Sequence, residues 1–136
     1  MTAFIPALLS GIASVLIGWI WYSPRLFGGA WIRLTNLGPE QIERGKRLFK
    51  IDELFGLIAF MVLAYAMAFV GTKLQVTTAM GAFGLGCLCW AGFCTPALLG
   101  QVLWEQKPVA LFLITSTYWL LSFVATTFIL FYTAAL

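Results

Sequence analysis

The uneven distribution of charged side chains constrains this fold more than any other feature of the sequence. Ten of the thirteen Asp, Glu, Lys and Arg residues lie between Arg25 and Glu53. Outside that stretch only Lys73, Glu105 and Lys107 are charged, so four long, mostly apolar runs carry no charge. A helix of about 20 such residues crosses the hydrocarbon core of a bilayer. The pattern therefore predicts four membrane spans and one long polar connection.

Composition excludes a soluble domain. Hydrophobic residues make up 62% of the 136 residues and charged residues 10%, whereas a soluble domain carries about a quarter charged residues. A chain this short buries only roughly two-thirds of its surface, so lipid must cover the remainder. We expect an all-α integral membrane bundle of four transmembrane helices, one domain over residues 1–136, with a short interfacial or cytoplasmic helical loop between helices 1 and 2. The expected spans are about 4–22, 54–72, 77–104 and 109–132, and the polar loop is 25–53.

The first run predicts a retained span rather than a cleaved signal peptide. A signal peptide has a basic start, a shorter apolar centre and a small-residue cleavage site. Here the start is uncharged and the run ends in Trp19, Trp21 and Tyr22, which suit an anchor among lipid headgroups. Pro24 then ends the helix, because the residue before a proline avoids helical dihedrals.

Two helices are expected inside the polar loop. Phe27, Trp31 and Leu34 share one helical face, which is typical of a short helix lying in the headgroup region. Pro39 suits an early position of a second, polar helix, whose charged run we interpret as a solvated face, with a docking surface for a partner as the alternative. The favourable i, i+4 ion pairs of that helix are Glu40–Arg44 and Glu43–Arg47.

The boundaries of the later spans follow from charge and proline. We expect the second span to begin at Asp52 and Glu53, because carboxylates suit the positive end of a helix. The third run is long for one crossing, and three interpretations stay open: it tilts, it begins late near Gly81, or it bends at Pro96. Short connections predict that spans two, three and four are antiparallel neighbours.

The basic residues predict the orientation. The loop at 25–53 holds six Lys and Arg residues and the turn at 105–108 holds one, against Lys73 alone at the other end. The positive-inside rule then places the loop in the cytoplasm and both termini on the outer side. We expect a multi-pass protein of the bacterial cytoplasmic (inner) membrane, in contact with the lipid bilayer and not with nucleic acid.

Small and hydroxylated residues recur on single helix faces. Small residues let another helix approach closely, so those of spans one and two predict an interface, although they are also tolerated singly in lipid. Span four carries hydroxyls within about 40° of one another, which most often bond backbone carbonyls or a neighbouring helix; a narrow polar cavity is the alternative. The candidate interface is Ser10, Ser14, Gly18, Gly56, Ala64 and Ala68, and the candidate cavity is Thr115, Tyr118, Ser122 and Thr126.

The four runs contain no ionisable residue, and the chain has no His. Acid–base chemistry and proton relays need such groups, so we expect no catalytic residue, no cofactor and no enzyme. Cys87 and Cys94 share a helix face about 10 Å apart and Cys89 points elsewhere, so we expect no metal site and interpret all three as small buried hydrophobes.

Two sequence patches resemble a known family. They are W-Y-S-P-R-L-F-G-G-A-W at 21–31 and W-A-G-F-C-T-P-A-L-L at 90–99, followed by E-Q-K-P-V-A-L-F-L-I and Tyr118. Together they resemble the bacterial domain-of-unknown-function family seventeen-sixty-one, which implies four spans and brings no activity. In the last span the family pattern implies Asn-Ala-Gly-Tyr-His, whereas this chain has T-S-T-Y-W at 115–119. The first patch predicts an interfacial brace made of Trp21, Tyr22, Pro24, Phe27, Gly28 and Trp31.

Three functional hypotheses follow. The first is a non-enzymatic accessory, assembly or stabilising subunit that packs against itself or a larger membrane complex through its small-residue faces. The second is a carrier or binder of a small uncharged or apolar solute in the hydroxyl-lined cavity. The third is an enzyme acting on lipid, which would need the carboxylates of Asp52, Glu53 and Glu105.

Overall fold

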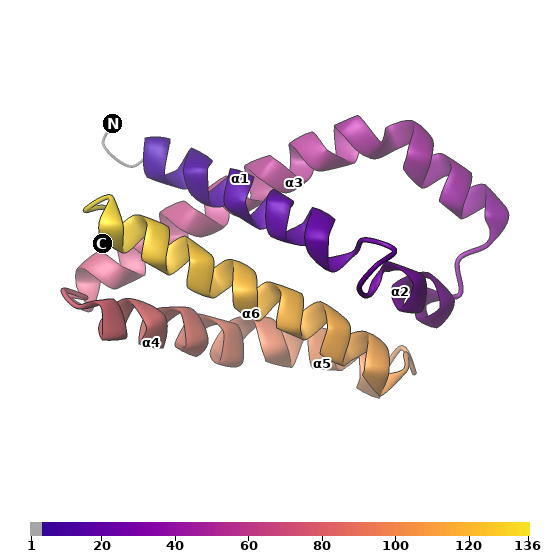
Figure 1. Ribbon diagram of the computed structural model, residues 1–136. Helices are drawn as coiled ribbons and strands as arrows, with labels where there is room; N and C mark the ends of the chain where they lie inside the picture. Colours follow the sequence, from indigo (N-terminus) through magenta and orange to yellow (C-terminus); the bar gives the residue numbers. More distant parts are fainter. Residues whose placement is uncertain (1–3) are drawn as a thin grey trace.

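A computed structural model describes residues 4–136 and contains helices joined by short connections (Figure 1). Four helical units in this range are long and apolar enough to cross a membrane, so the expected all-α, four-span architecture is confirmed. The first three residues of the expected domain lie outside the described residues. The elements are α1 (Phe4–Trp21), α2 (Gly28–Thr35), α3 (Pro39–Lys73), α4 (Ala79–Cys89), the π-helical turn η1 (Trp90–Cys94), α5 (Thr95–Leu103) and α6 (Val109–Tyr132).

Helix α6 lies at the centre of the bundle. It packs along α1 on one side and along α4 on the other, while α3 crosses α1 and also contacts α6 and α4 (Figure 1). The turn at 74–78 and the C-terminus lie at one end, called here the terminal end. The loop with α2 and the connection at 104–108 lie at the other, called the polar end. Sequence reasoning predicted the contacts among α3, α4 and α6 but did not predict the packing of α1 on α6.

Helix α3 corrects two predictions. The expected polar helix and the second span form one uninterrupted helix of 35 residues, about 52 Å long and far longer than the hydrocarbon core. It begins at Pro39, where the Gln41 side chain accepts a hydrogen bond from the Gly38 N–H at 2.8 Å. Asp52 and Glu53 therefore lie in mid-helix, and the prediction that they stand at the positive end of a helix was wrong because nothing between them and Pro39 breaks the helix.

The expected ion pairs of the polar part of α3 are also corrected. Among residues 4–136 the salt bridge is between Lys46 Nζ and Glu43 Oε1 at 3.1 Å, an i, i+3 pair, in place of the two predicted i, i+4 pairs. Both of its side chains are exposed, so the pair contributes little to stability.

The third span is irregular where proline was expected to disturb it. Thr78 caps α4 by accepting a hydrogen bond from the Gly81 N–H at 3.0 Å, so the helix begins at Ala79 and not later. The π-helical turn η1 ends immediately before α5, in which Pro96 is the second residue. Proline lacks the N–H that an α-helix needs, and π turns of this kind accompany breaks in helix regularity.

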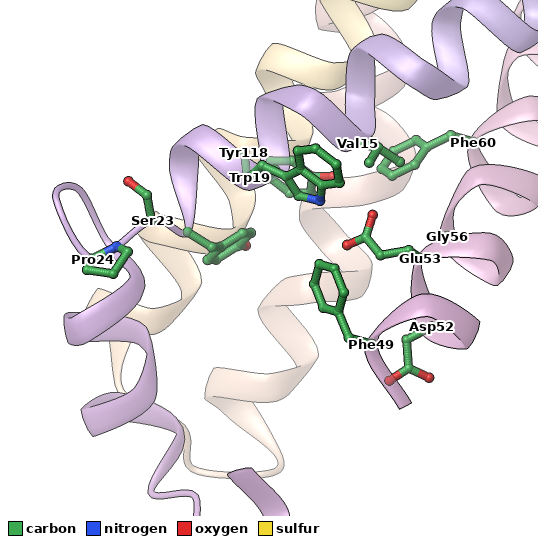
Figure 2. Close-up of a pocket in the computed structure, with 12 residues that line it drawn as sticks. Val15, Trp19, Ser23, Pro24, Phe49, Asp52, Glu53, Gly56, Phe60 and Tyr118 are labelled. Atoms are coloured by element: carbon green, nitrogen blue, oxygen red, sulfur yellow. The ribbon is translucent and has the colours of Figure 1, made fainter. Parts of the chain in front are cut away.

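Helices α1 and α3 approach closely at one crossing and then separate. A Cβ added at Gly11 would lie 2.8 Å from Leu57 Cδ1 and 3.2 Å from the Leu57 carbonyl oxygen. Towards the polar end α3 leaves α1 (Figure 1), and Trp19, Phe49 and Glu53 project into the space between them (Figure 2). Because the two helices are antiparallel, Trp19 and Phe49 each lie eight residues, about 12 Å, beyond this crossing.

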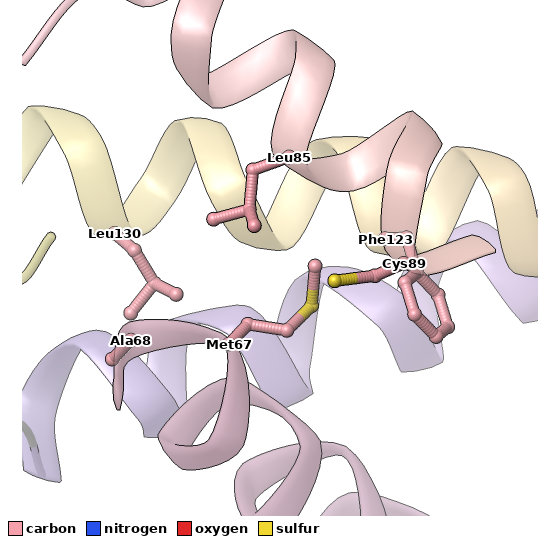
Figure 3. Packing of buried hydrophobic residues seen from close by; sticks show 6 residues of the cluster. All are labelled: Met67, Ala68, Leu85, Cys89, Phe123 and Leu130. Carbon is pink, nitrogen blue, oxygen red and sulfur yellow. The ribbon is translucent and has the colours of Figure 1, made fainter. Parts of the chain in front are cut away.

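The hydrophobic core occupies the terminal half, where α3, α4 and α6 meet (Figure 3). Each of the three helices contributes two buried side chains, which point towards one another. They are Met67 and Ala68 of α3, Leu85 and Cys89 of α4, and Phe123 and Leu130 of α6.

Candidate functional site

A cavity of about 500 Å³ lies between α1 and the polar half of α3, with α6 behind it. We call it the α1–α3 cleft. It exists because α3 leaves α1 on the polar side of the Gly11 crossing (Figure 1), so no side chain of α1 fills the widening gap. Its lining includes Val15, Trp19, Tyr22, Phe49, Glu53, Gly56, Phe60 and Tyr118.

Aromatic rings form the inner wall of the cleft. Tyr118 of α6 is almost fully buried, and its ring packs edge-to-face on Tyr22 at 5.3 Å and on Phe60 at 6.2 Å between centroids. Such arrangements hold rings in fixed orientations. Trp19 and Phe49 stand at the rim, 53% and 49% exposed. The cleft therefore has a rigid aromatic base and two large rings at its opening.

One carboxylate faces these rings. Glu53 reaches from α3 across the cleft towards Trp19, while the neighbouring, exposed Asp52 also lines the cavity but directs its carboxylate away from Trp19 (Figure 2). Within residues 4–136 Glu53 forms no salt bridge, since the one present joins Lys46 and Glu43. Glu53 lies about 30 Å along α3 from Lys73, a distance close to the thickness of a hydrocarbon core.

The cleft is open in two directions. A groove of about 320 Å³ shares Val15, Trp19 and Glu53 with the cleft and is otherwise lined by Lys50 and by apolar side chains such as Leu16 and Leu54. We call it the outer groove. On the opposite side, Tyr22 and Phe49 also line a space of about 720 Å³ between α2, α3 and α6. The cleft thus shares lining residues with the outer groove and with the space beside α2.

The predicted interfacial brace forms one wall of this region. Trp21 Nε1 donates a hydrogen bond to the Ile114 carbonyl at 3.0 Å, which ties the end of α1 to α6. The Phe27 ring packs on Trp21 at 4.4 Å between centroids. A Cβ at Gly28 would overlap the Tyr22 carbonyl oxygen, so glycine is required where the chain turns back. The W-Y-S-P turn therefore holds α2 beside the cleft; Trp31 also packs on Tyr22, while Pro24 is exposed.

Comparison with protein families tests the family resemblance of the two sequence patches at 21–31 and 90–99. A family model described as "Protein of unknown function (DUF1761)" matches residues 5–131. The chain belongs to the DUF1761 family. The match extends over all four spans and includes both sequence patches, so the predicted resemblance is confirmed. No curated protein and no solved structure matches the chain.

In this DUF1761 protein the small residues of α1 pack inside the chain. Ser10 and Ser14 have no exposed surface, and a Cβ at Gly18 would lie 3.2 Å from the Tyr118 hydroxyl oxygen. That hydroxyl donates a hydrogen bond to the Ser14 carbonyl at 3.2 Å. The candidate interface of α1 is therefore occupied by α6 of the same protein.

The hydroxyl face of α6 is divided among three environments. Tyr118 lines the α1–α3 cleft, and Thr115 lines the space beside α2. Ser122 and Thr126 have no exposed surface, and their hydroxyls have no hydrogen-bond partner in the described structure. The four residues therefore do not line one continuous cavity, because Ser122 and Thr126 are enclosed by tight helix packing.

The small residues of α3 are divided in the same way. Ala64 and Ala68 are buried, whereas a Cβ at Gly56 would meet no atom within 4 Å and would point into open space beside the cleft. Sequence reasoning missed Gly11 and Gly86, which make the closest helix approaches. A Cβ at Gly86 would lie 2.9 Å from Thr127 Oγ1, yet a single glycine in an apolar run carries no spacing signal.

The cysteines and other ligating groups are dispersed. Cys89 is buried in the core (Figure 3), Cys87 and Cys94 are half-buried, and all three are free thiols. Across residues 4–136 no three His, Cys, Asp or Glu side chains come together in an arrangement that would hold a metal ion. The chemistry of the site therefore comes from aromatic rings, hydroxyls and Glu53.

Proposed function

We propose that this DUF1761 protein binds a small, membrane-partitioning molecule in the α1–α3 cleft, at the boundary between hydrocarbon and headgroups. The observation that carries this proposal is the cavity of about 500 Å³ with an aromatic base and the carboxylates of Glu53 and Asp52 in its lining. Small-molecule sites are typically concave, mostly apolar and about 300–1,000 Å³ in volume, with a few polar groups that orient the ligand. The cleft meets each of these conditions.

Binding rather than catalysis fits the residues that face the cleft. General acid–base catalysis requires a second group within hydrogen-bond reach of the reacting atoms. Tyr118 directs its hydroxyl to the Ser14 carbonyl, and Glu53 has no ion-pair partner among the described residues. We therefore propose a binder or carrier and not an enzyme.

The proposal is tested by filling the cleft. Gly56→Leu places an isobutyl group in the open space beside Phe60, where no atom lies within 4 Å of the new Cβ. Native mass spectrometry of protein released gently from its membrane should detect a bound small molecule on the wild type and lose it in this variant. Gly84→Leu is the matched control, because Gly84 is equally open but lies on α4. A wild-type protein with no bound molecule, or equal retention in both variants, would contradict the proposal.

A second candidate is an accessory or assembly subunit that packs against itself or a larger membrane complex. The specific observation in its favour is the outer face of the third span, where Gly84 and Gly92 have no atom within 4 Å of a Cβ and Met80 is 78% exposed. Small residues facing lipid permit close approach by another helix. This role is tested by measuring the molecular mass of the protein in mild detergent by light scattering. A wild-type oligomer that becomes a monomer in Gly92→Leu would support the role, and a monomeric wild type would contradict it.

We propose that the polar end faces the cytoplasm of a bacterial inner membrane, with both termini on the outer side. The support is the six Lys and Arg residues between 25 and 53, against Lys73 alone at the terminal end. An impermeant maleimide on intact cells should label Gln75→Cys and spare Arg44→Cys until the membrane is permeabilised. The reverse labelling would overturn this orientation.

A further inference from the structure

We propose that the ligand of the α1–α3 cleft is a small lipophilic organic cation, with an ammonium head held between Glu53 and the aromatic rings. This inference rests on the proposed function, since it names the chemical class of the molecule that the cleft binds. Elsewhere in residues 4–136, no pocket combines a carboxylate, several rings and a comparable open volume.

The charge of the site favours a cation. Glu53 extends from α3 into the cleft towards Trp19 (Figure 2), and no Lys or Arg pairs with it among residues 4–136. A carboxylate beside apolar walls attracts an opposite charge more strongly than one in bulk water, because the local dielectric constant is lower. The cleft would therefore select a positively charged head over a neutral or anionic one.

The rings of the cleft favour an organic ammonium over an inorganic ion. A cation over the face of Trp, Tyr or Phe is attracted by the ring quadrupole, and aromatic cages recognise quaternary ammonium groups in this way. Trp19 and Phe49 present half-exposed rings at the rim, and Tyr22 and Tyr118 form the wall behind them. Inorganic cations prefer oxygen ligands, of which the cleft offers few.

The shape of the site favours a molecule with a compact head and an apolar body. The outer groove of about 320 Å³ begins at Val15, Trp19 and Glu53 and continues between α1 and α3 over exposed apolar residues. An ammonium head beside Glu53 would thus leave its apolar part in this groove. The combined space suits a molecule of drug size, so we commit to a small amphiphile and treat a membrane lipid as an outcome of the test.

The basic side chains around the site leave Glu53 available. Lys50 lies one turn before Glu53 and lines the outer groove, and Arg25 lines a neighbouring pocket beside Trp19. Both are exposed, and neither is within salt-bridge distance of Glu53 in the described structure. Long basic side chains at this depth direct their charged ends towards water, so they border the site without neutralising its carboxylate.

Two isosteric probes test the inference. Phenyltrimethylammonium carries a quaternary ammonium head, and tert-butylbenzene has the same shape without the charge. Calorimetric titration of the full chain in a maltoside detergent should show at least tenfold tighter binding of the cation. Glu53→Gln should weaken cation binding at least tenfold and leave the neutral probe unchanged. Glu40→Gln removes the same charge from an exposed position of α3 outside the cleft and should change either affinity less than twofold.

The outcomes separate this inference from the proposed function. If both probes bind equally and Glu53→Gln affects neither, the cation inference is overturned while the cleft remains a binding site. If neither probe binds the wild type, or if Gly56→Leu leaves both affinities unchanged, the proposed function fails as well. If an ethanolamine phospholipid displaces phenyltrimethylammonium in a Glu53-dependent way at stoichiometric amounts, a lipid amine is the occupant and the small-molecule assignment is overturned. Unchanged melting temperatures of the variants confirm that folding is intact.

Discussion

Helices α1 and α3 meet tightly at the Gly11 crossing and stand apart at the polar end, although both regions belong to the same two helices. At the crossing a Cβ on Gly11 would press on Leu57. Eight residues further along each helix, Trp19 and Phe49 remain half exposed around an open cleft. In lipid, helices associate by close packing and not by the hydrophobic effect, so small residues close an interface while bulky rings hold it open.

The small residues of α3 repeat this contrast within one helix. Ala64 lies close to the same side of α3 as Gly56, but Ala64 has no exposed surface whereas Gly56 borders the cleft. A small side chain therefore closes a seam only where a second helix is near enough to fill the space above it. Substitutions that add volume should therefore distinguish the two regions. They should lower the stability of the protein where helices touch and leave it unchanged where helices stand apart.

The largest effect is expected at the contact between α4 and α6. Gly86→Leu would drive a side chain into the backbone of Val124, since a Cβ there already lies 3.0 Å from its Cα. Overpacking of this kind costs about 3 kcal/mol or more, measured as a lower melting temperature in detergent. Gly84→Leu, two residues earlier on the open face of α4, should change stability by less than about 0.5 kcal/mol. Equal melting temperatures would show that α4 does not pack on α6 in this way.

The next effect compares the two regions of the α1–α3 pair directly. Gly11→Val should destabilise the protein by about 2 kcal/mol, because its side chain would meet both the Leu57 side chain and the Leu57 carbonyl. Gly56→Leu adds more volume on the facing helix but enters the cleft, so its melting temperature should stay close to that of the wild type. A larger loss of stability in Gly56→Leu than in Gly11→Val would mean that the cleft is closed in the folded protein.

A smaller effect is expected from the hydrogen bond that joins the third span to α6. Trp90 Nε1 donates to the Ser116 carbonyl at 2.8 Å, and Trp90→Phe removes this donor while keeping most of the ring. Interhelical hydrogen bonds in membranes contribute about 0.6 kcal/mol on average and up to about 1.7, so we expect a loss of about 1 kcal/mol. Trp104→Phe is the control, because Trp104 is 85% exposed. This variant should have the melting temperature of the wild type.

The smallest effect concerns the bond at the base of the cleft. Tyr118→Phe removes the hydroxyl that donates to the Ser14 carbonyl at 3.2 Å but leaves the aromatic wall in place. We expect a loss of about 0.6 kcal/mol and less than a twofold change in the binding of phenyltrimethylammonium. Tyr65→Phe on the exposed side of α3 provides the matched control. A large loss of binding in Tyr118→Phe alone would show that the hydroxyl itself contacts the ligand.

Much of the fold was predictable because lipid imposes a simple rule on charge. The absence of charge over four long runs predicted α1 and α6 almost to the residue, and the aromatic spacing of Phe27 and Trp31 predicted α2. A bend at Pro96 was one of three interpretations of the long third run, and the π-helical turn η1 lies directly before the helix that contains Pro96. These features depend on the local sequence and on the length of helix that crosses a bilayer.

The cleft was not predictable in this way. The sequence between Pro39 and Glu53 contains no proline or other strong helix breaker, which is consistent with one continuous helix. The change from polar to apolar residues near Glu53 nevertheless led to the prediction that one helix ends and another begins at that point. Whether Glu53 meets solvent or the rings of α1 depends on the angle between α1 and α3, which helical periodicity does not specify. The choice of α6 as the partner of Ser10 and Ser14 likewise requires three-dimensional packing.

The most direct test of the open cleft is the reactivity of a single thiol at two positions of α3. In a chain with its three native cysteines replaced by alanine, Gly56→Cys and Ala64→Cys would each be treated with N-ethylmaleimide in detergent. Only a thiol with access to water ionises and reacts readily, so the account predicts alkylation at position 56 at least about tenfold faster than at position 64. Equally slow alkylation at both positions would contradict it, because α1 and α3 would then be closed along their whole length.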